Sequence, residues 1–190
     1  MPRKPPSLLM PHSILIEHAV NNHPRTRSIL SRFPEIKPRY IRSITDAPET
    51  TTHRTMILAK HNGTTVVPCP GTPAYLCCNY HIINIGIGCA YRCTYCFLHQ
   101  YRNTYGHILY MNIEDAVNTL RHMEATGALS FKRIGTGEFT DSLLYDEITG
   151  YSRLLIQFFA QKNLCLELKT KSAHINHLLD LNHGKKTVMA

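Results

Sequence analysis

The pattern of apolar and polar residues predicts strands and helices in alternation over residues 64–190. Residues 80–87 are mostly apolar, as in a parallel strand that is buried on both faces. Shorter strands are predicted at 64–67, 131–134 and 164–169, and a last one opens at 185. The residues after 64–67, from Pro68 to Gly71, predict a turn.

Helices are predicted between these strands. Asn112 is a candidate N-cap and Gly127 suits the C′ position of one helix. Its expected core face consists of Ile113, Ala116, Val117, Leu120 and Met123. Further helices are predicted at 151–162 and 174–181. The β-α-β-α-β-α-β order predicts an α/β fold with a parallel sheet, either open and Rossmann-like or a partial (β/α) barrel. Because the chain ends as a strand opens, we expect a fragment or a truncated relative of a longer protein.

Residues 1–63 differ from the rest in being basic and interrupted by prolines. Two helix faces are predicted there, the first from Ile14, Leu15, His18 and Ala19 and the second from Ile29, Leu30 and Phe33. We therefore expect a basic N-terminal extension, residues 1–63, packed on a main domain, residues 64–190.

Composition narrows the class of protein. Apolar residues make up 43% of the 190 residues, enough to bury a core. No apolar run approaches a membrane span, and no secretory signal is recognisable, which favours a cytoplasmic protein. Seven cysteines, an odd number, are expected to stay reduced there. The formal charge of +8 favours a polyanionic partner such as nucleic acid, although scattered basic residues also suit an ordinary surface.

The most specific chemistry is the spacing Cys89-x3-Cys93-x2-Cys96. Thiolates are soft ligands that suit iron–sulfur clusters or zinc. Three ligands on a four-iron cluster leave one iron open to a substrate or cofactor. Alternatively, His99 completes a Cys3His zinc site. Three further cysteines, either a second metal site or buried thiols, are Cys69, Cys77 and Cys78.

Polar motifs follow successive predicted strands. The cysteines follow the first strand, Gly135-Thr136-Gly137-Glu138 follows the next, and Lys169 and Lys171 follow the third. Parallel α/β folds place their active sites at this edge of the sheet. Gly137 would permit close approach of a ligand, and Glu138 could accept a hydrogen bond from an ammonium group. The charged face of the third strand is either paired in an interior or solvated on a surface.

These motifs resemble those of radical S-adenosylmethionine enzymes, and more closely the spore photoproduct lyase, or DNA repair photolyase-like, group. The matching stretches are 68–73 with 77–78, 89–101, 133–142 and 168–172. The resemblance implies a partial (β/α) barrel of the radical SAM type, with a [4Fe-4S] cluster on Cys89, Cys93 and Cys96. It also implies S-adenosyl-L-methionine at the open iron, a 5′-deoxyadenosyl radical, an external electron donor of the flavodoxin or ferredoxin type, and lyase chemistry on DNA lesions.

The resemblance also assigns roles to single residues. Glu138, beside Gly137, would contact the methionyl amino group, and Tyr95 would lie near the adenine. Lys171, or else Lys169, would meet the methionyl carboxylate. The residues expected to hold the same end of the cofactor are Thr140, Asp141 and Ser142.

Two departures from the group are visible. Its DNA-repairing members carry a cysteine just after the second strand, whereas no cysteine occurs here between Cys96 and Cys165. The group's barrel also continues for several more strands. Two other interpretations stay open, a zinc-stabilised nucleic-acid-binding module and a radical enzyme that acts on a small molecule or RNA.

Overall fold

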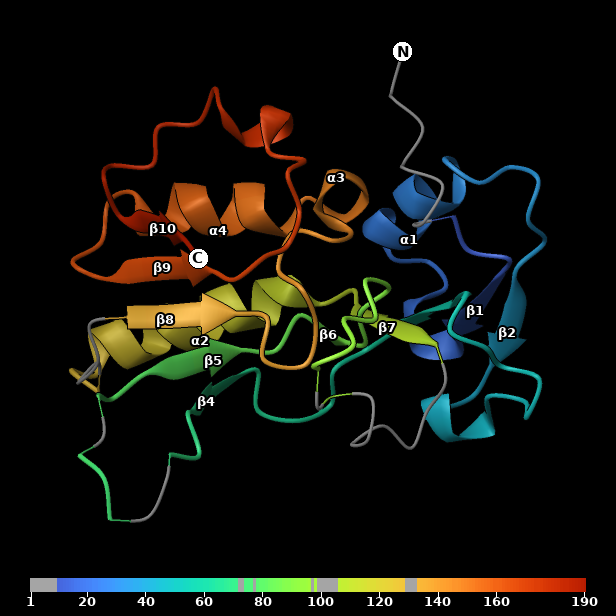
Figure 1. Ribbon diagram of the computed structural model, residues 1–190, viewed down its shortest axis with the longest axis horizontal. Coiled ribbons are helices and arrows are strands. Elements are labelled where there is room, and N and C mark those ends of the chain that lie inside the picture. The colour runs from blue at the N-terminus through green and yellow to red at the C-terminus, as the bar shows by residue number, and fades with distance from the viewer. Residues whose placement is uncertain (1–9, 72–73, 77, 97, 99–105, 129–132) are drawn as a thin grey trace.

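The strands form two five-stranded sheets that lie side by side (Figure 1). The structure is a computed structural model that describes residues 10–71, 74–76, 78–96, 98, 106–128 and 133–190. The first sheet has the order β2-β1-β3-β7-β6, and the second has the order β10-β9-β8-β5-β4. In each sheet all neighbouring strands are parallel except the last pair, β7–β6 or β5–β4.

The first sheet is built mainly from the N-terminal part of the chain. Its strands are β1 (Ser13–Glu17), β2 (Arg39–Ile41), β3 (Thr55–Ala59), β6 (Gly86–Ile87) and β7 (His107–Tyr110). The helix α1 (Pro24–Leu30) and the 3-10 turns η2 (His18–Val20) and η3 (Ile44–Asp46) connect them. Because β3 pairs with β7, residues before 63 share a sheet with residues after 64. The expected boundary between an extension and a main domain stays a prediction.

The predicted helix face from Ile14 to Ala19 is wrong, since β1 occupies most of that segment. All residues of β1 after Ser13 are buried. A strand that is buried on both faces carries apolar residues at consecutive positions, which periodicity alone does not separate from a short helix. The second predicted helix face is confirmed in part, because Ile29 and Leu30 lie in α1.

The second sheet follows the predicted order of strands. It contains β4 (Val66–Pro68), β5 (His81–Ile83), β8 (Arg133–Thr136), β9 (Cys165–Leu168) and β10 (Thr187–Met189). The predicted strand at 80–87 is divided between the sheets as β5 and β6. The division falls where the Asn84 N–H donates to the Thr65 carbonyl oxygen and the Ile85 carbonyl oxygen accepts from Tyr110 N–H.

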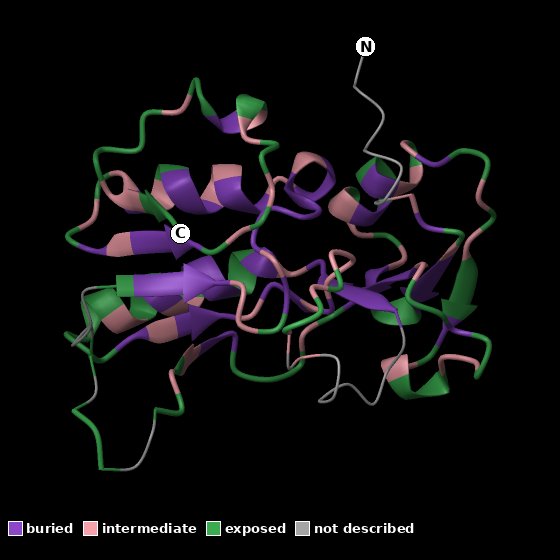
Figure 2. Cartoon of the chain, viewed as in Figure 1, coloured by how far each residue is buried: buried purple, intermediate pink, exposed green. Residues whose placement is uncertain are grey.

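Two of the predicted helices are present and cover one face of the second sheet (Figure 1). They are α2 (Ile113–Ala125) and α4 (Tyr151–Phe159), which pack against each other, with the short α3 (Asp146–Thr149) before α4. The expected core face of α2 is confirmed, since Ile113, Ala116, Val117 and Leu120 are buried and Met123 is half-buried against the same core. One apolar cluster runs from Ile14 in β1 through Leu120 to Leu166 in β9. Figure 2 shows this buried core along both sheets.

The helix predicted at 174–181 is wrong. The segment forms a single 3-10 turn, η5 (Asn176–Leu178), in which only Leu178 is buried. Ile175 and Leu181 still pack against the core beside Leu178, so the apolar spacing correctly indicates core contacts but does not require a helix.

The predicted fold class is confirmed as an α/β fold with parallel strands. Within the described residues the strands form two open sheets and no closed barrel. None of the helices in these ranges is both long enough and apolar enough to cross a membrane.

Candidate functional site

Three loops meet at the carboxyl edge of the second sheet. They are the cysteine loop (88–96), which follows β5 and β6, the glycine loop (137–142) after β8, and the lysine loop (169–172) after β9. Gly88 N–H donates to the Phe139 carbonyl oxygen at 2.7 Å, and the Thr140 hydroxyl donates to the Gly88 carbonyl oxygen at 2.7 Å. Ser142 N–H donates to the Lys169 carbonyl oxygen at 3.0 Å. The three motifs therefore lie together at one edge of the sheet, as predicted.

Asp141 joins the glycine loop to the lysine loop. Its Oδ1 accepts from the Thr170 hydroxyl at 2.7 Å and from Leu143 N–H at 2.9 Å. Its Oδ2 accepts from Lys171 N–H at 2.6 Å. Because the carboxylate spans two loops, it fixes the position from which the Lys171 side chain projects.

Gly137 lies where a side chain would not fit. Its φ is +90°, and an added Cβ would lie 2.7 Å from Ser142 Oγ and 3.0 Å from the Thr140 carbonyl oxygen. The Thr136 hydroxyl donates to Ser142 Oγ at 2.7 Å in a buried contact beneath the loop. Glycine is required here by the close packing of the loop on itself.

The cysteine loop carries three free, half-buried thiols at Cys89, Cys93 and Cys96. Burial raises the pKa of the Cys89 thiol, while hydrogen bonds from backbone N–H groups of Tyr91 and Asp141 oppose that rise. Cys96 N–H donates to the Cys93 carbonyl oxygen at 2.9 Å, which closes a turn between those two residues. The donor chemistry, three soft sulfur atoms in one loop, fits an iron–sulfur cluster.

In the part of the chain that the structure describes, no three His, Cys, Asp or Glu side chains form a metal-binding group. The cluster assignment to Cys89, Cys93 and Cys96 therefore stays a prediction. His99, on which the zinc alternative depends, and Cys77 lie outside the described residues.

On the charged face of β9, Glu167 is buried and paired, whereas Lys169 and Lys171 are exposed. Glu167 is 7% exposed, and its carboxylate lies 3.7 Å from the Lys169 ammonium and 3.9 Å from the Arg133 guanidinium. The Tyr80 hydroxyl is hydrogen-bonded to the same carboxylate. Burial, and to a lesser extent this hydrogen bond, raises the pKa of Tyr80. The Lys169 ammonium also lies 4.7 Å from the centre of the Tyr80 ring. The Lys169 ammonium is therefore engaged by Glu167 and Tyr80, although the side chain is about half exposed.

The remaining predicted ligand residues lie around this edge. Glu138 is half-buried, and burial raises its pKa against the opposing charge of Lys169. Lys171 is exposed. Tyr95 is 76% exposed, and a hydrogen bond with Cys93 raises its pKa. The structure brings the loops of these residues together, and their ligand contacts stay predictions.

Sequence reasoning missed contacts that hold the site. Thr170 accepts from Ser172 N–H at 2.8 Å as well as donating to Asp141, and Tyr91 hydrogen-bonds to the Ser172 side chain. The second contact joins the cysteine loop to the lysine loop. A Thr-x-Ser sequence after a strand suggests a local side-chain turn, but it does not indicate a partner about 80 residues away in the chain.

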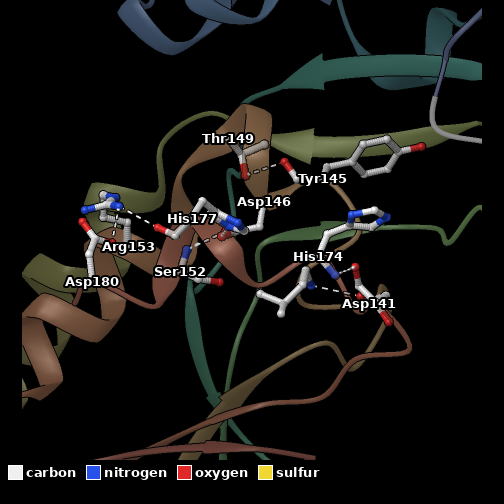
Figure 3. Close-up of polar contacts among 11 residues, drawn as sticks. Asp141, Tyr145, Asp146, Thr149, Ser152, Arg153, His174, His177 and Asp180 are labelled. Carbon is white, nitrogen blue, oxygen red and sulfur yellow. Dashed lines mark hydrogen bonds and ion pairs between the residues drawn. The ribbon is translucent and has the colours of Figure 1, made fainter. Parts of the chain in front are cut away.

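A second missed network fixes the segment after the lysine loop (Figure 3). The buried Asp146 accepts from Ser152 N–H at 2.7 Å and lies 2.6 Å from His177 Nε2. Arg153 donates to the His177 carbonyl oxygen at 2.6 Å and pairs with Asp180 at 3.1 Å. These bonds attach η5 to α3 and α4.

The fold and the edge site together define a parallel α/β protein with a thiol-containing strand-end site. A family model for spore photoproduct lyase matches residues 10–190. The chain belongs to the spore photoproduct lyase family, which confirms the resemblance seen in the sequence.

Comparisons with individual proteins support this family membership. Spore photoproduct lyase of Bacillus subtilis (strain 168) is 29% identical over 109 residues, which cover 56% of this chain and 32% of that protein. A solved spore photoproduct lyase mutant with bound AdoMet and dinucleoside spore photoproduct has a TM-score of 0.79 and 21% identity, over 94% of this chain and 55% of that one. A second solved spore photoproduct lyase, complexed with dinucleoside spore photoproduct, has a TM-score of 0.79 and 21% identity. The match covers 95% of this chain and 56% of that one. The chain thus spans about a third of the curated relative and just over half of the solved chains.

Proposed function

We propose that this chain provides the cofactor-binding half of a radical S-adenosylmethionine enzyme that acts on lesions in DNA. The observation that carries the proposal is the junction of the cysteine, glycine and lysine loops at one sheet edge. It is supported by membership of the spore photoproduct lyase family and by similar structures whose names record AdoMet and a dinucleoside lesion. The chain's charge of +8 suits a DNA substrate.

Cys89, Cys93 and Cys96 would hold a [4Fe-4S] cluster through their sulfur atoms. When bound, the cluster and S-adenosylmethionine supply reductive cleavage of the sulfonium, which gives methionine and a 5′-deoxyadenosyl radical that abstracts hydrogen from the substrate. The electron would come from an external donor of the flavodoxin or ferredoxin type.

The chain's own residues would bind and orient the methionyl end of the cofactor. Glu138, as a carboxylate, would accept hydrogen bonds from the methionyl ammonium, and the ammonium would favour the ionised form of a group whose pKa burial raises. Lys171 would pair with the methionyl carboxylate. Lys169 is the weaker candidate, because Glu167 and the Tyr80 ring already engage its ammonium.

Other residues at this edge of the sheet would hold the loops in place or lie beside the cofactor. Asp141 would hold the lysine loop, and Ser142 and Thr140 would fix the glycine loop through the bonds described above. Tyr95, exposed beside Cys96, would offer its ring to the adenine. At the place where DNA-repairing members carry a cysteine, this chain has the stretch 138–141 without one.

Iron and sulfide analysis after anaerobic reconstitution tests the proposal. We expect about four irons per chain in the wild type, and loss of most of that iron in Cys89→Ala, Cys93→Ala and Cys96→Ala. Cys165→Ala is the matched control, because Cys165 is a half-buried free thiol at the opposite end of β9. Full iron content in the three loop variants, or equal loss in the control, would contradict the assignment.

A further inference from the structure

A cavity of about 370 Å³ lies between the cysteine loop and the first sheet. Ala90 and Arg92 of the cysteine loop form one side of it, and the first residues of β3 and β7, Thr55 and His107, lie on another. His107 Nδ1 is hydrogen-bonded to the Tyr145 hydroxyl in a buried contact, which makes part of the wall rigid. The cavity is within the size range of small-ligand sites.

The charged groups that line the cavity are basic. His53 and Arg54 face it from the segment before β3, and Arg92 faces it from the cysteine loop. No carboxylate occurs among the described residues that line it. Burial lowers the pKa of His53, and the positive charges of Arg92, Arg54 and His12 lower it further. Like charges from separate segments therefore converge on one space, an arrangement that a bound anion would relieve.

Arginine suits oxyanions, both carboxylates and phosphates, and a DNA substrate supplies phosphates. A guanidinium has five N–H donors in a planar fork that matches phosphate oxygens. Arg54 uses one donor on the Met10 carbonyl oxygen at 3.4 Å, so most of its donors are available to a ligand. Arg92 has a positive φ of +47° and lines the cavity from the cysteine loop. Two arginines from different segments could thus hold one tetrahedral anion from two sides.

We propose that this cavity binds a backbone phosphodiester of the DNA strand next to the reacting nucleotide. The inference rests on the proposed function, because it takes DNA as the substrate. Ala90 and Arg92 lie between Cys89 and Cys93, so a phosphate held here is adjacent to the site of radical chemistry. The cavity would set the register of the strand without reading its sequence, as phosphate contacts do.

The test is fluorescence anisotropy of the full chain with a labelled single-stranded thymidine oligonucleotide over a range of salt concentrations. Arg54→Gln and Arg92→Gln should each weaken binding about tenfold, the loss expected for a charged hydrogen-bonded contact. Each should also reduce the salt slope by about 0.7 for one lost phosphate. Arg39→Gln, an exposed arginine in β2, removes the same charge elsewhere and should change neither quantity. Circular dichroism and iron content should match the wild type in Arg54→Gln, which lies outside the cysteine loop.

A neutral phosphate analogue separates a direct contact from general attraction. In an oligonucleotide that carries one spore photoproduct to fix its register, one methylphosphonate placed at successive positions should weaken wild-type binding at a single position and leave the Arg54→Gln variant insensitive there. Equal affinity of wild type, Arg54→Gln and Arg92→Gln for DNA would overturn the inference and leave the proposed function standing. Failure of the wild type to bind any DNA would overturn the DNA substrate itself. Tighter binding of thymidine monophosphate than of the oligonucleotide would show a free-nucleotide site and overturn the backbone assignment.

Discussion

Replacement of Asp141 by alanine should release the lysine loop from the glycine loop. The carboxylate accepts three hydrogen bonds, at 2.6, 2.7 and 2.9 Å, and two of them come from the lysine loop. A hydrogen bond to a charged group contributes about 1.5–3 kcal/mol net. Because Asp141 is half-buried and solvent can replace part of the loss, we expect Asp141→Ala to lower the free energy of unfolding by about 2–4 kcal/mol. In a chain of 190 residues this corresponds to a fall in Tm of roughly 10 °C.

Two measurements check this prediction. Thermal unfolding gives the change in Tm, and amide hydrogen exchange reports the N–H groups of Lys171 and Leu143, which should exchange faster in Asp141→Ala. Asp141→Asn keeps one acceptor oxygen and should fall between alanine and wild type. Asp180→Ala is the control, since Asp180 has a side chain that is 70% exposed and pairs only at the surface with Arg153. Equal Tm changes in the Asp141 and Asp180 variants, with unchanged exchange at Lys171, would refute the reasoning.

Three further predictions follow from single contacts. Gly135→Ala should destabilise the fold by about 1–3 kcal/mol in urea unfolding, because its Cβ would overlap the Tyr80 hydroxyl; wild-type stability would contradict this. Tyr151→Phe should cost about 1–2 kcal/mol in the same assay, since it removes a buried 2.6 Å bond to a backbone carbonyl oxygen of β7; a cost near zero would refute it. Burial raises the pKa of Glu114, but hydrogen bonds from Arg25 outweigh it and leave the pKa below 4.5. The ionised pair therefore adds stability above about pH 4.5 that is lost as pH falls further, and Glu114→Gln should flatten the wild-type curve of stability against pH in this range.

The second sheet and its edge site were predictable because their signals are local. The apolar face of α2 has a clear helical period, and polar motifs follow β8 and β9 directly in sequence. The parallel order then places those motifs at one edge, as the hydrogen bond from Ser142 N–H to the Lys169 carbonyl oxygen confirms.

The first sheet was harder to predict because its strands are short and the three central ones, β1, β3 and β7, are buried on both faces. In β3 all five residues are buried, so no alternation marks the strand. The pairing of β3 with β7 joins Met56 to His107, about fifty residues apart, and no local pattern specifies such a partner. The cavity beside Arg54 and Arg92 was likewise not predictable, since it depends on how the first sheet meets the cysteine loop.

The pairing of Glu167 illustrates a choice that only packing decides. The sequence allowed either a solvated or an interior charged row on β9. The absence of a side chain at Gly135 leaves room for Tyr80 to reach the Glu167 carboxylate, and Lys169 and Arg133 complete its charge balance. That arrangement needs three strands in register, so the alternation in β9 alone could not predict it.

The most direct test of the proposed radical chemistry is electron paramagnetic resonance of the reconstituted, reduced protein with and without S-adenosylmethionine. The account predicts a [4Fe-4S] signal that changes on addition of the cofactor, because an iron without a cysteine ligand would bind it directly. A cluster signal that is unaffected by S-adenosylmethionine, or a colourless protein that retains zinc, would contradict it.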